Sequence, residues 1–211
     1  MALTLPRKDR VFPTRSSDHL GRWTRADGAY NVVNHDTEPL SAMWAMYPLL
    51  RVPRGARLAG LLTRFRVDWA GRAALERGAE VVPNAVTVSG GCTLDLTTAP
   101  TDRLRVATKL FGNWPERAVT VETYTGWLAI GADEGIKDLG SWINHDGWPR
   151  ACSGLFDVAI EPGIGNADDL GRAISAARAM VVKPGGRQSW TARLPVVRSD
   201  EPRPESRRLP R

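Results

Sequence analysis

Turn signals recur along the middle of this chain and leave only short stretches between them. Clusters of Gly, Pro, Asn and Asp favour turns, so they end helices and strands alike. Their spacing therefore predicts a fold made of many short elements. The predicted turns lie at Asn34-His35-Asp36, Pro53-Arg54-Gly55, Ser89-Gly90-Gly91, Asp133-Glu134-Gly135, Asp146-Gly147 and Pro184-Gly185-Gly186.

The segments between these turns are rich in Val, Leu, Trp, Phe and Thr, which are typical of strands. In the last segment, large apolar and polar residues alternate, and this period of two indicates a strand with one buried side. Its predicted inward residues are Trp190, Ala192, Leu194 and Val196. The predicted strand segments are 57–69, 80–88, 104–111, 118–125, 126–130, 155–160 and 189–197.

One segment, residues 168–180, has a helical pattern. Leu170, Ile174 and Ala177 recur at i, i+4 and i+7, and Asn166 is the candidate N-cap. One short helix among many short strands favours an all-β fold, an antiparallel β-sandwich or barrel.

The overall composition is that of a folded, water-soluble domain. Apolar residues make up 42% of the 211 residues, charged residues make up 25%, and the mean hydropathy is -0.29. Charge, Pro and Ser without periodicity mark both ends of the chain. We therefore expect a flexible N-terminal arm over residues 1–27, one domain over 28–197, and a disordered Arg/Pro-rich tail over 198–211.

The formal net charge of +6 is concentrated at the ends of the chain. Residues 1–27 hold six basic residues against three acidic ones, and residues 198–211 hold five against three. The segment between them is nearly neutral, with 18 basic and 17 acidic residues. A groove that binds nucleic acid needs clustered basic residues on the folded body, so we expect no nucleic-acid partner.

The two cysteines, Cys92 and Cys152, form no CxxC pair and have no His at metal-ligand spacing. The sequence therefore predicts no zinc site, no disulfide framework and no cofactor. No apolar run has the ~18 to 20 residues that a membrane span requires, and the N-terminus lacks a secretory signal, so we expect a cytoplasmic protein without a membrane partner.

Two clusters combine aromatic residues with polar ones. In the first, the turn at Asn34 and His35 leads into a segment that contains Trp44, Tyr47 and Pro48. A hairpin turn with a core tryptophan explains this cluster as well as a site does. In the second, Trp142 and Trp148 flank Asn144, His145 and Asp146. Tryptophans stack on sugar rings while amides and carboxylates bind hydroxyls, so this cluster suits a carbohydrate, although purely structural roles fit it equally.

The third candidate is Glu161, at the end of the predicted strand 155–160 and just before a Gly-rich loop. Such a carboxylate acts as a general base if burial raises its pKa toward neutrality. Equally, it accepts hydrogen bonds from loop amides. The loop, GIGNADD, lacks the spacing of a phosphate-binding loop.

Over residues 29–197, an ordered set of motifs resembles the aldose 1-epimerase (galactose mutarotase)-like proteins. The downstream motifs are WINHDGWPR from Trp142, the strand into IEPGIG, DDLGRA, Val182 to Gly186, and Trp190. The upstream motifs are Asn34, Trp44-Ala45, Pro48-Leu49-Leu50, Val52 and Pro53 to Leu58.

The resemblance implies a mutarotase-like supersandwich, shortened on its N-terminal side, that binds a small-molecule sugar in a cleft. In active members a glutamate takes the proton from the C1 hydroxyl while a histidine protonates the ring oxygen. Glu161 matches the base, whereas Tyr47 stands where the family has its histidine. Tyrosine titrates near 10, so we expect slow or no epimerisation unless another donor serves, and His35 is the preferred substitute.

The site expected from these motifs and the resemblance contains residues that bind the sugar as well as residues that transfer protons. The expected sugar-binding residues are Asn34, Trp44, Trp142, Asn144, His145 and Trp148. Trp142, His145, Trp148 and Glu161 are expected on one concave face. The alternative reading is an inactive remnant that serves as a sugar-binding or interaction module. The sequence leaves the sugar and the oligomeric state open.

Overall fold

The computed structural model describes residues 24–61, 64–71, 75–87, 91, 93–99, 105–124, 126–149 and 154–198. Most of the predicted N-terminal arm, nearly all of the predicted tail, and both cysteines lie outside these ranges. The first described residue, Thr24, already belongs to a strand.

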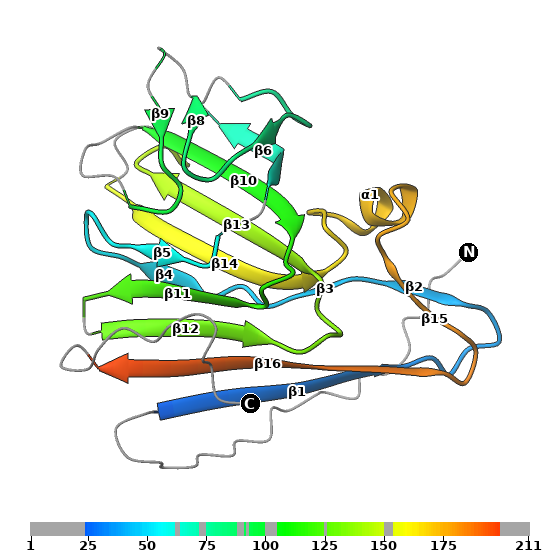
Figure 1. Ribbon diagram of the computed structural model, residues 1–211. Coiled ribbons are helices and arrows are strands. Elements are labelled where there is room, and N and C mark those ends of the chain that lie inside the picture. Colours follow the sequence, from blue (N-terminus) through cyan, green and yellow to red (C-terminus); the bar gives the residue numbers. More distant parts are fainter. Residues whose placement is uncertain are drawn as a thin grey trace.

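Two antiparallel sheets lie face to face and form a sandwich (Figure 1). The five-stranded sheet has the order β1 (Thr24–Val33), β16 (Arg187–Arg198), β12 (Gly126–Ala132), β11 (Ala118–Thr123) and β5 (Leu58–Ala59). The seven-stranded sheet has the order β3 (Trp44–Ala45), β14 (Phe156–Ile164), β13 (Asp138–His145), β10 (Val106–Asn113), β6 (Phe65–Gly71) and β7 (Glu80–Val81), with β4 (Leu49–Arg51) also paired to β14. The prediction of an all-β antiparallel sandwich is confirmed.

Two small two-stranded sheets complete the described strands. One pairs β2 (Leu40–Ala42) with β15 (Met180–Val182), and the other pairs β8 (Val86–Thr87) with β9 (Thr93–Leu94). The segments predicted as 57–69 and 80–88 are each divided between two strands, because the chain passes from one sheet to another within them.

The hydrophobic core lies between the two large sheets. Successive residues of a strand point to opposite faces, so alternate apolar residues of each sheet meet there. Trp190 and Ala192 of β16 are buried as predicted. Leu194, also predicted to point inward, is half-buried like Thr191 and Arg193, but it packs against the core. The inner residues include Leu110, Ile143 and Ile160 on the seven-stranded sheet, and Val119, Ile130 and Ala192 on the five-stranded one.

The helix is shorter than predicted, and its cap and buried face differ from the prediction. Helix α1 runs from Leu170 to Ser175, and Asp169 rather than Asn166 is its N-cap, because the Asp169 side chain accepts a hydrogen bond from the Arg172 amide. Ala173 is its buried residue, while Leu170 and Ile174 are exposed. A six-residue helix has room for only one inward turn, so the expected apolar stripe does not form.

Candidate functional site

The outer face of the seven-stranded sheet carries charged and aromatic side chains. Register pairs Trp69 with Lys109, Lys109 with Trp142, and Gly140 with Glu161. Residues that pair directly across two strands share a face of the sheet, and so do residues two apart along one strand. These five residues therefore lie on the face of the sheet that points away from the core. We call this surface the Glu161 face.

Lys109 and Glu161 form a buried ion pair on this face. Lys109 Nζ donates a hydrogen bond to Glu161 Oε2 and lies 3.7 Å from Asp168 Oδ1. The side chains of Lys109 and Glu161 are only 7% and 3% exposed. Burial raises the pKa of Glu161 as expected, although the Lys109 ammonium opposes the shift. Glu161 Oε1 is also buried and accepts no hydrogen bond from the described residues.

Glu161 lies inside strand β14 and not at its end as predicted. The strand continues through Pro162 to Ile164, and the Pro162 carbonyl accepts a hydrogen bond from the Met46 amide at 3.0 Å. Strand β13 pairs with Glu161 itself, and β3 pairs with Gly163, two residues further on. Both strands therefore fix the backbone around Glu161.

Gly140 provides the space through which the Glu161 carboxylate reaches Lys109. A Cβ at Gly140 would lie 2.9 Å from the Phe111 ring and 3.1 Å from Glu161 Oε2. Both contacts are shorter than ordinary van der Waals distances. A side chain at this position therefore competes directly with the ion pair.

Gly140→Ala is expected to lower the free energy of unfolding by about 1 to 3 kcal/mol, the usual cost of overpacking. Urea unfolding measures this change. Gly171→Ala is the matched control, because a Cβ there meets only Asp169 Oδ1, at 3.4 Å. Equal stability of the two variants would show that Gly140 does not make room for the pair.

Three tryptophans form a continuous aromatic group beside the ion pair. The ring centroids of Trp69 and Trp142 are 5.4 Å apart and stacked, and Trp148 meets Trp142 edge-on at 6.0 Å. The Trp142 indole N–H donates a hydrogen bond to Asp157 Oδ1 at 3.1 Å. Trp69 and Trp148 are 37% and 48% exposed, so part of each indole is open to a ligand.

Asn144 is buried and shapes the turn that carries Trp148. Its side-chain oxygen accepts hydrogen bonds from the Gly147 and Trp148 amides, and its side-chain amide donates to the Trp148 carbonyl. Burial raises the pKa of Asp157, and hydrogen bonds from Trp142 and Asn144 partly oppose this shift. The observed contacts of Asn144 thus position Trp148 and Asp157.

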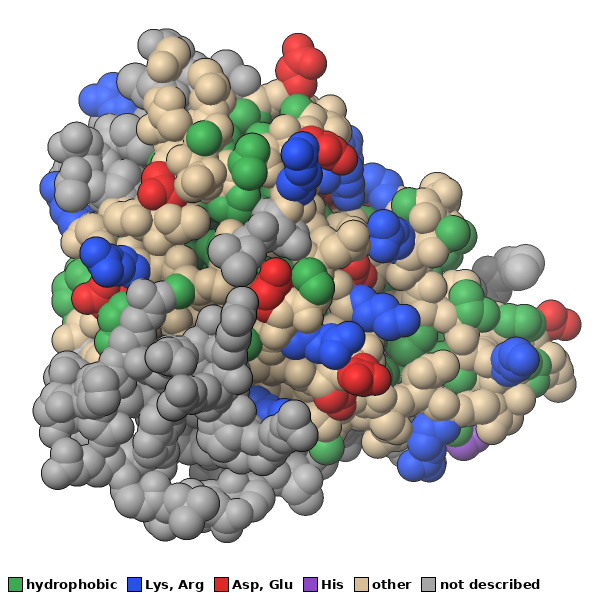
Figure 2. Space-filling view, in the orientation of Figure 1, with side chains coloured by type: hydrophobic (Ala, Val, Ile, Leu, Met, Phe, Trp, Pro, Cys, Tyr) green, Lys and Arg blue, Asp and Glu red, His purple; other side chains and the backbone are tan. Residues whose placement is uncertain are grey.

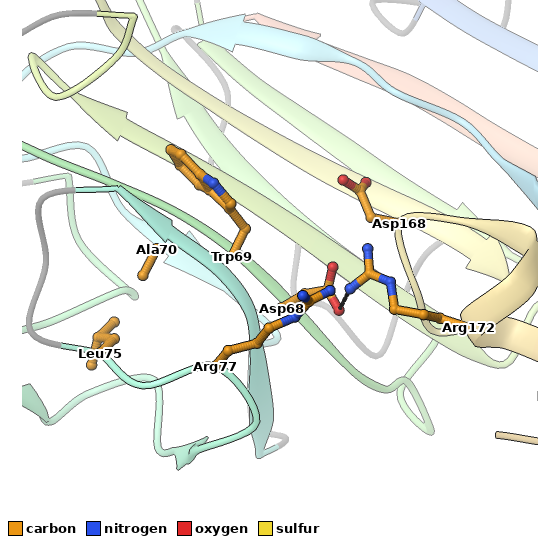
Figure 3. Close-up of a pocket in the computed structure, with 7 residues that line it drawn as sticks. All are labelled: Asp68, Trp69, Ala70, Leu75, Arg77, Asp168 and Arg172. Carbon is orange, nitrogen blue, oxygen red and sulfur yellow. Dashed lines mark hydrogen bonds and ion pairs between the residues drawn. The ribbon is translucent and has the colours of Figure 1, made fainter. Parts of the chain in front are cut away.

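A pocket of about 250 Å³ lies next to this aromatic group (Figure 3). Trp69, Asp68 and Asp168 line it together with two arginines, Arg77 and Arg172. Arg172 ties α1 to strand β6 through an ion pair with Asp68 Oδ1 at 2.6 Å. Asp68 Oδ2 is buried and has no hydrogen-bond partner among the described residues, which leaves an acceptor for a ligand hydroxyl.

Tyr47 lies over the ion pair. Lys109 Nζ is 4.6 Å from the centroid of its ring, and the side chain is half exposed. Burial and the nearby Glu161, Asp157 and Asp168 carboxylates raise the pKa of Tyr47 above its ordinary value. The phenol is therefore an even weaker acid than the sequence implies.

His145 does not join the Glu161 face. It lies one residue beyond Asn144 on β13, so its side chain points to the opposite side of the sheet, where it is 2% exposed. Trp142 and Glu161 lie on one face as expected, and Trp148 contacts Trp142, whereas the expected position of His145 is wrong. Burial lowers the pKa of His145 to about 4.

The titration of His145 is expected to make stability depend on pH. Its pKa falls from 6.5 in the unfolded chain to about 4 in the folded one. The free energy of unfolding is therefore about 3 kcal/mol higher above pH 6.5 than below pH 4. This difference is lost progressively as the pH falls from 6.5 toward 4. Urea unfolding across this range should show a smaller loss for His145→Gln than for the wild type. The same loss in both proteins would contradict this assignment.

The other predicted residues lie elsewhere. The Asn34 side chain donates hydrogen bonds to the Glu38 and Val182 carbonyls, so it joins the turn after β1 to the end of β15. His35, next to it, is exposed. Trp44 packs against Tyr30 and Trp190, with centroid distances of 4.7 and 5.4 Å. Structural roles account for the observed contacts of Asn34 and Trp44.

Sequence reasoning missed Lys109, Trp69 and Asp68. Lys109 was an isolated lysine inside an apolar strand segment, and the only signal for it was that an unpaired lysine is costly to bury. Asp68 and Trp69 lie where the register between β6 and β10 shifts at a β-bulge, which the sequence does not reveal.

Neither metal sites nor membrane-spanning helices are found in the described part of the chain. No group of three or more His, Cys, Asp or Glu residues there could hold a metal ion. No helix there is long and apolar enough to cross a membrane. On the face seen in Figure 2, basic and acidic described side chains are interspersed.

Solved structures share this fold. A candidate aldose 1-epimerase from Klebsiella pneumoniae aligns with 84% of this chain at 12% identity and a TM-score of 0.58. A galactose mutarotase related enzyme from Lactobacillus acidophilus aligns with 84% at 16% identity and a TM-score of 0.53. A galactose mutarotase-like protein from Clostridium acetobutylicum aligns with 80% at 12% identity and a TM-score of 0.53.

The chain therefore has a galactose mutarotase-like fold. It spans 44%, 59% and 51% of the lengths of these three proteins, respectively. No protein-family model and no curated protein sequence matches it.

Proposed function

We propose that this protein binds a small sugar on the Glu161 face and interconverts the anomers of a free aldose. The observation that carries the proposal is the buried Glu161 carboxylate, which lies beside partly exposed tryptophans and a charged pocket. A general base needs a raised pKa and an acceptor atom that no other donor occupies, and Glu161 has both among the described residues. The shared fold with proteins named for aldose epimerisation supports the same chemistry.

The proposed roles follow from the contacts. Trp69 and Trp148 offer indole faces on which the apolar side of a sugar ring stacks. Asp68 and Arg172 lie in the adjoining pocket, where they bind hydroxyl groups. Glu161 Oε1 accepts the proton of the C1 hydroxyl.

The competing proposal is a protein that binds sugar without catalysis. The observation that favours it is Tyr47, whose raised pKa makes it a poor proton donor to a ring oxygen.

Polarimetry of freshly dissolved α-glucose and α-galactose tests the proposal. We expect the optical rotation to relax faster with the protein than with the same protein after heat denaturation. An unchanged rate for every free aldose tried would overturn the proposed activity. Saturable sugar binding, measured by calorimetry, would then favour the competing proposal.

A further inference from the structure

The proposed reaction needs a proton donor for the ring oxygen, and neither of the expected histidines lies at the Glu161 carboxylate. His145 points to the opposite side of the sheet, and His35 is exposed in the turn after β1. Tyr47 is close to Glu161, but burial and then the neighbouring carboxylates raise the pKa of its phenol, so it is a weak proton donor.

Lys109 is the group that meets the geometric requirement. Its ammonium donates to Glu161 Oε2, lies 3.7 Å from Asp168 Oδ1 and approaches the rings of Tyr47 and Phe111. Asp168 also lines the pocket, so a single side chain links Nζ to the pocket. The ammonium carries three protons, whereas the arginines of the pocket do not release theirs near neutrality.

The arrangement also couples the two proton transfers. The negative charge of Glu161 holds the positive charge of Lys109 in a site that is almost fully buried. When Glu161 accepts a proton, its negative charge is lost, and a buried cation whose main counter-charge is gone is costly. Proton transfer to Glu161, which starts ring opening, therefore favours proton transfer from Lys109, which completes it.

We propose that Lys109 is the general acid of the reaction and takes the place of a histidine. The inference rests on the proposed epimerase function. Glu161 Oε1 takes the proton of the C1 hydroxyl, and O1 forms a double bond to C1. The bond between C1 and the ring oxygen breaks with its electron pair on the ring oxygen, which takes a proton from Lys109 Nζ. Ring closure on the other face of the aldehyde returns both protons.

Lys109→Arg is the decisive variant, because arginine keeps a cation beside Glu161 but does not release its proton. If Lys109 is the acid, polarimetry should show a loss of about 10²- to 10⁴-fold in the catalysed rate, with sugar binding by calorimetry retained. Lys183→Arg, in an exposed turn, is the matched control and should keep wild-type activity.

A second variant keeps the test decisive if the larger guanidinium does not fit. In a Cys92→Ser/Cys152→Ser background, Lys109→Cys removes the amine, and alkylation with 2-bromoethylamine restores one at the same chain length. We expect the unmodified variant to be inactive and the aminoethylated one to regain most of the activity.

The outcomes separate the two proposals. Full activity of Lys109→Arg, or of unmodified Lys109→Cys, in a wild type that is active would overturn the role of Lys109 and leave the epimerase function standing. A wild type that accelerates no anomer exchange would overturn both. Loss of the catalysed rate in Lys109→Arg supports the role of Lys109 as the acid. So does loss of the rate in Lys109→Cys that is recovered after aminoethylation.

Discussion

Lys109→Met is expected to lower the free energy of unfolding by about 3 to 5 kcal/mol, the usual cost of leaving one partner of a buried ion pair alone. The reason is that Glu161 would remain 3% exposed without the ammonium that faces it. Urea unfolding followed by tryptophan fluorescence measures the change.

The double variant Lys109→Met/Glu161→Leu removes both charges and should recover most of this loss, because apolar residues often replace a buried pair without cost. The exposed pair Arg64 and Glu80, whose closest atoms are 3.8 Å apart, is the control. Arg64→Met should cost no more than about 1 kcal/mol. Equal losses for Lys109→Met and Arg64→Met would contradict the burial of the pair.

Glu161→Gln is expected to reduce the catalysed rate of anomer exchange by about 10²- to 10⁴-fold, because the amide cannot accept the C1 proton. The amide keeps the size of the carboxylate, so sugar binding should change far less than turnover. Initial rates over a range of sugar concentrations separate the two effects.

Glu134→Gln is the matched control for this change, since the Glu134 side chain is 91% exposed and pairs only loosely with Arg117 at 3.8 Å. It should keep the wild-type rate. A Glu161→Gln protein that is folded and as active as the control would remove the proposed base.

The fold was predictable because its signals are local. Turn residues and period-two alternation mark strands without knowledge of their partners, as in β16, where Trp190 and Ala192 are buried as expected. The same alternation on β13 separates Trp142 and Asn144 from His145, so the error at His145 was avoidable from sequence.

The rest of the site depends on partners that are distant in the chain. Lys109 meets Glu161 across 52 residues, and only the register of three strands, with Gly140 between them, brings the two together. Pro162 and Gly163 indicated a strand end after Ile160, but pairing with β13 and β3 overrides that local preference.

A sugar bound on the Glu161 face would change the surroundings of the tryptophans there, and their indole N–H resonances report such a change. Single Trp→Phe variants assign the signals in ¹H–¹⁵N spectra, and α-galactose or α-glucose is then titrated into the wild type. Saturable shifts are expected for Trp69, Trp142 and Trp148. None is expected for Trp44 or Trp190, because Trp190 is part of the hydrophobic core and Trp44 packs against it. Shifts confined to Trp44 and Trp190, or no shift at any sugar concentration, would contradict sugar binding on the Glu161 face.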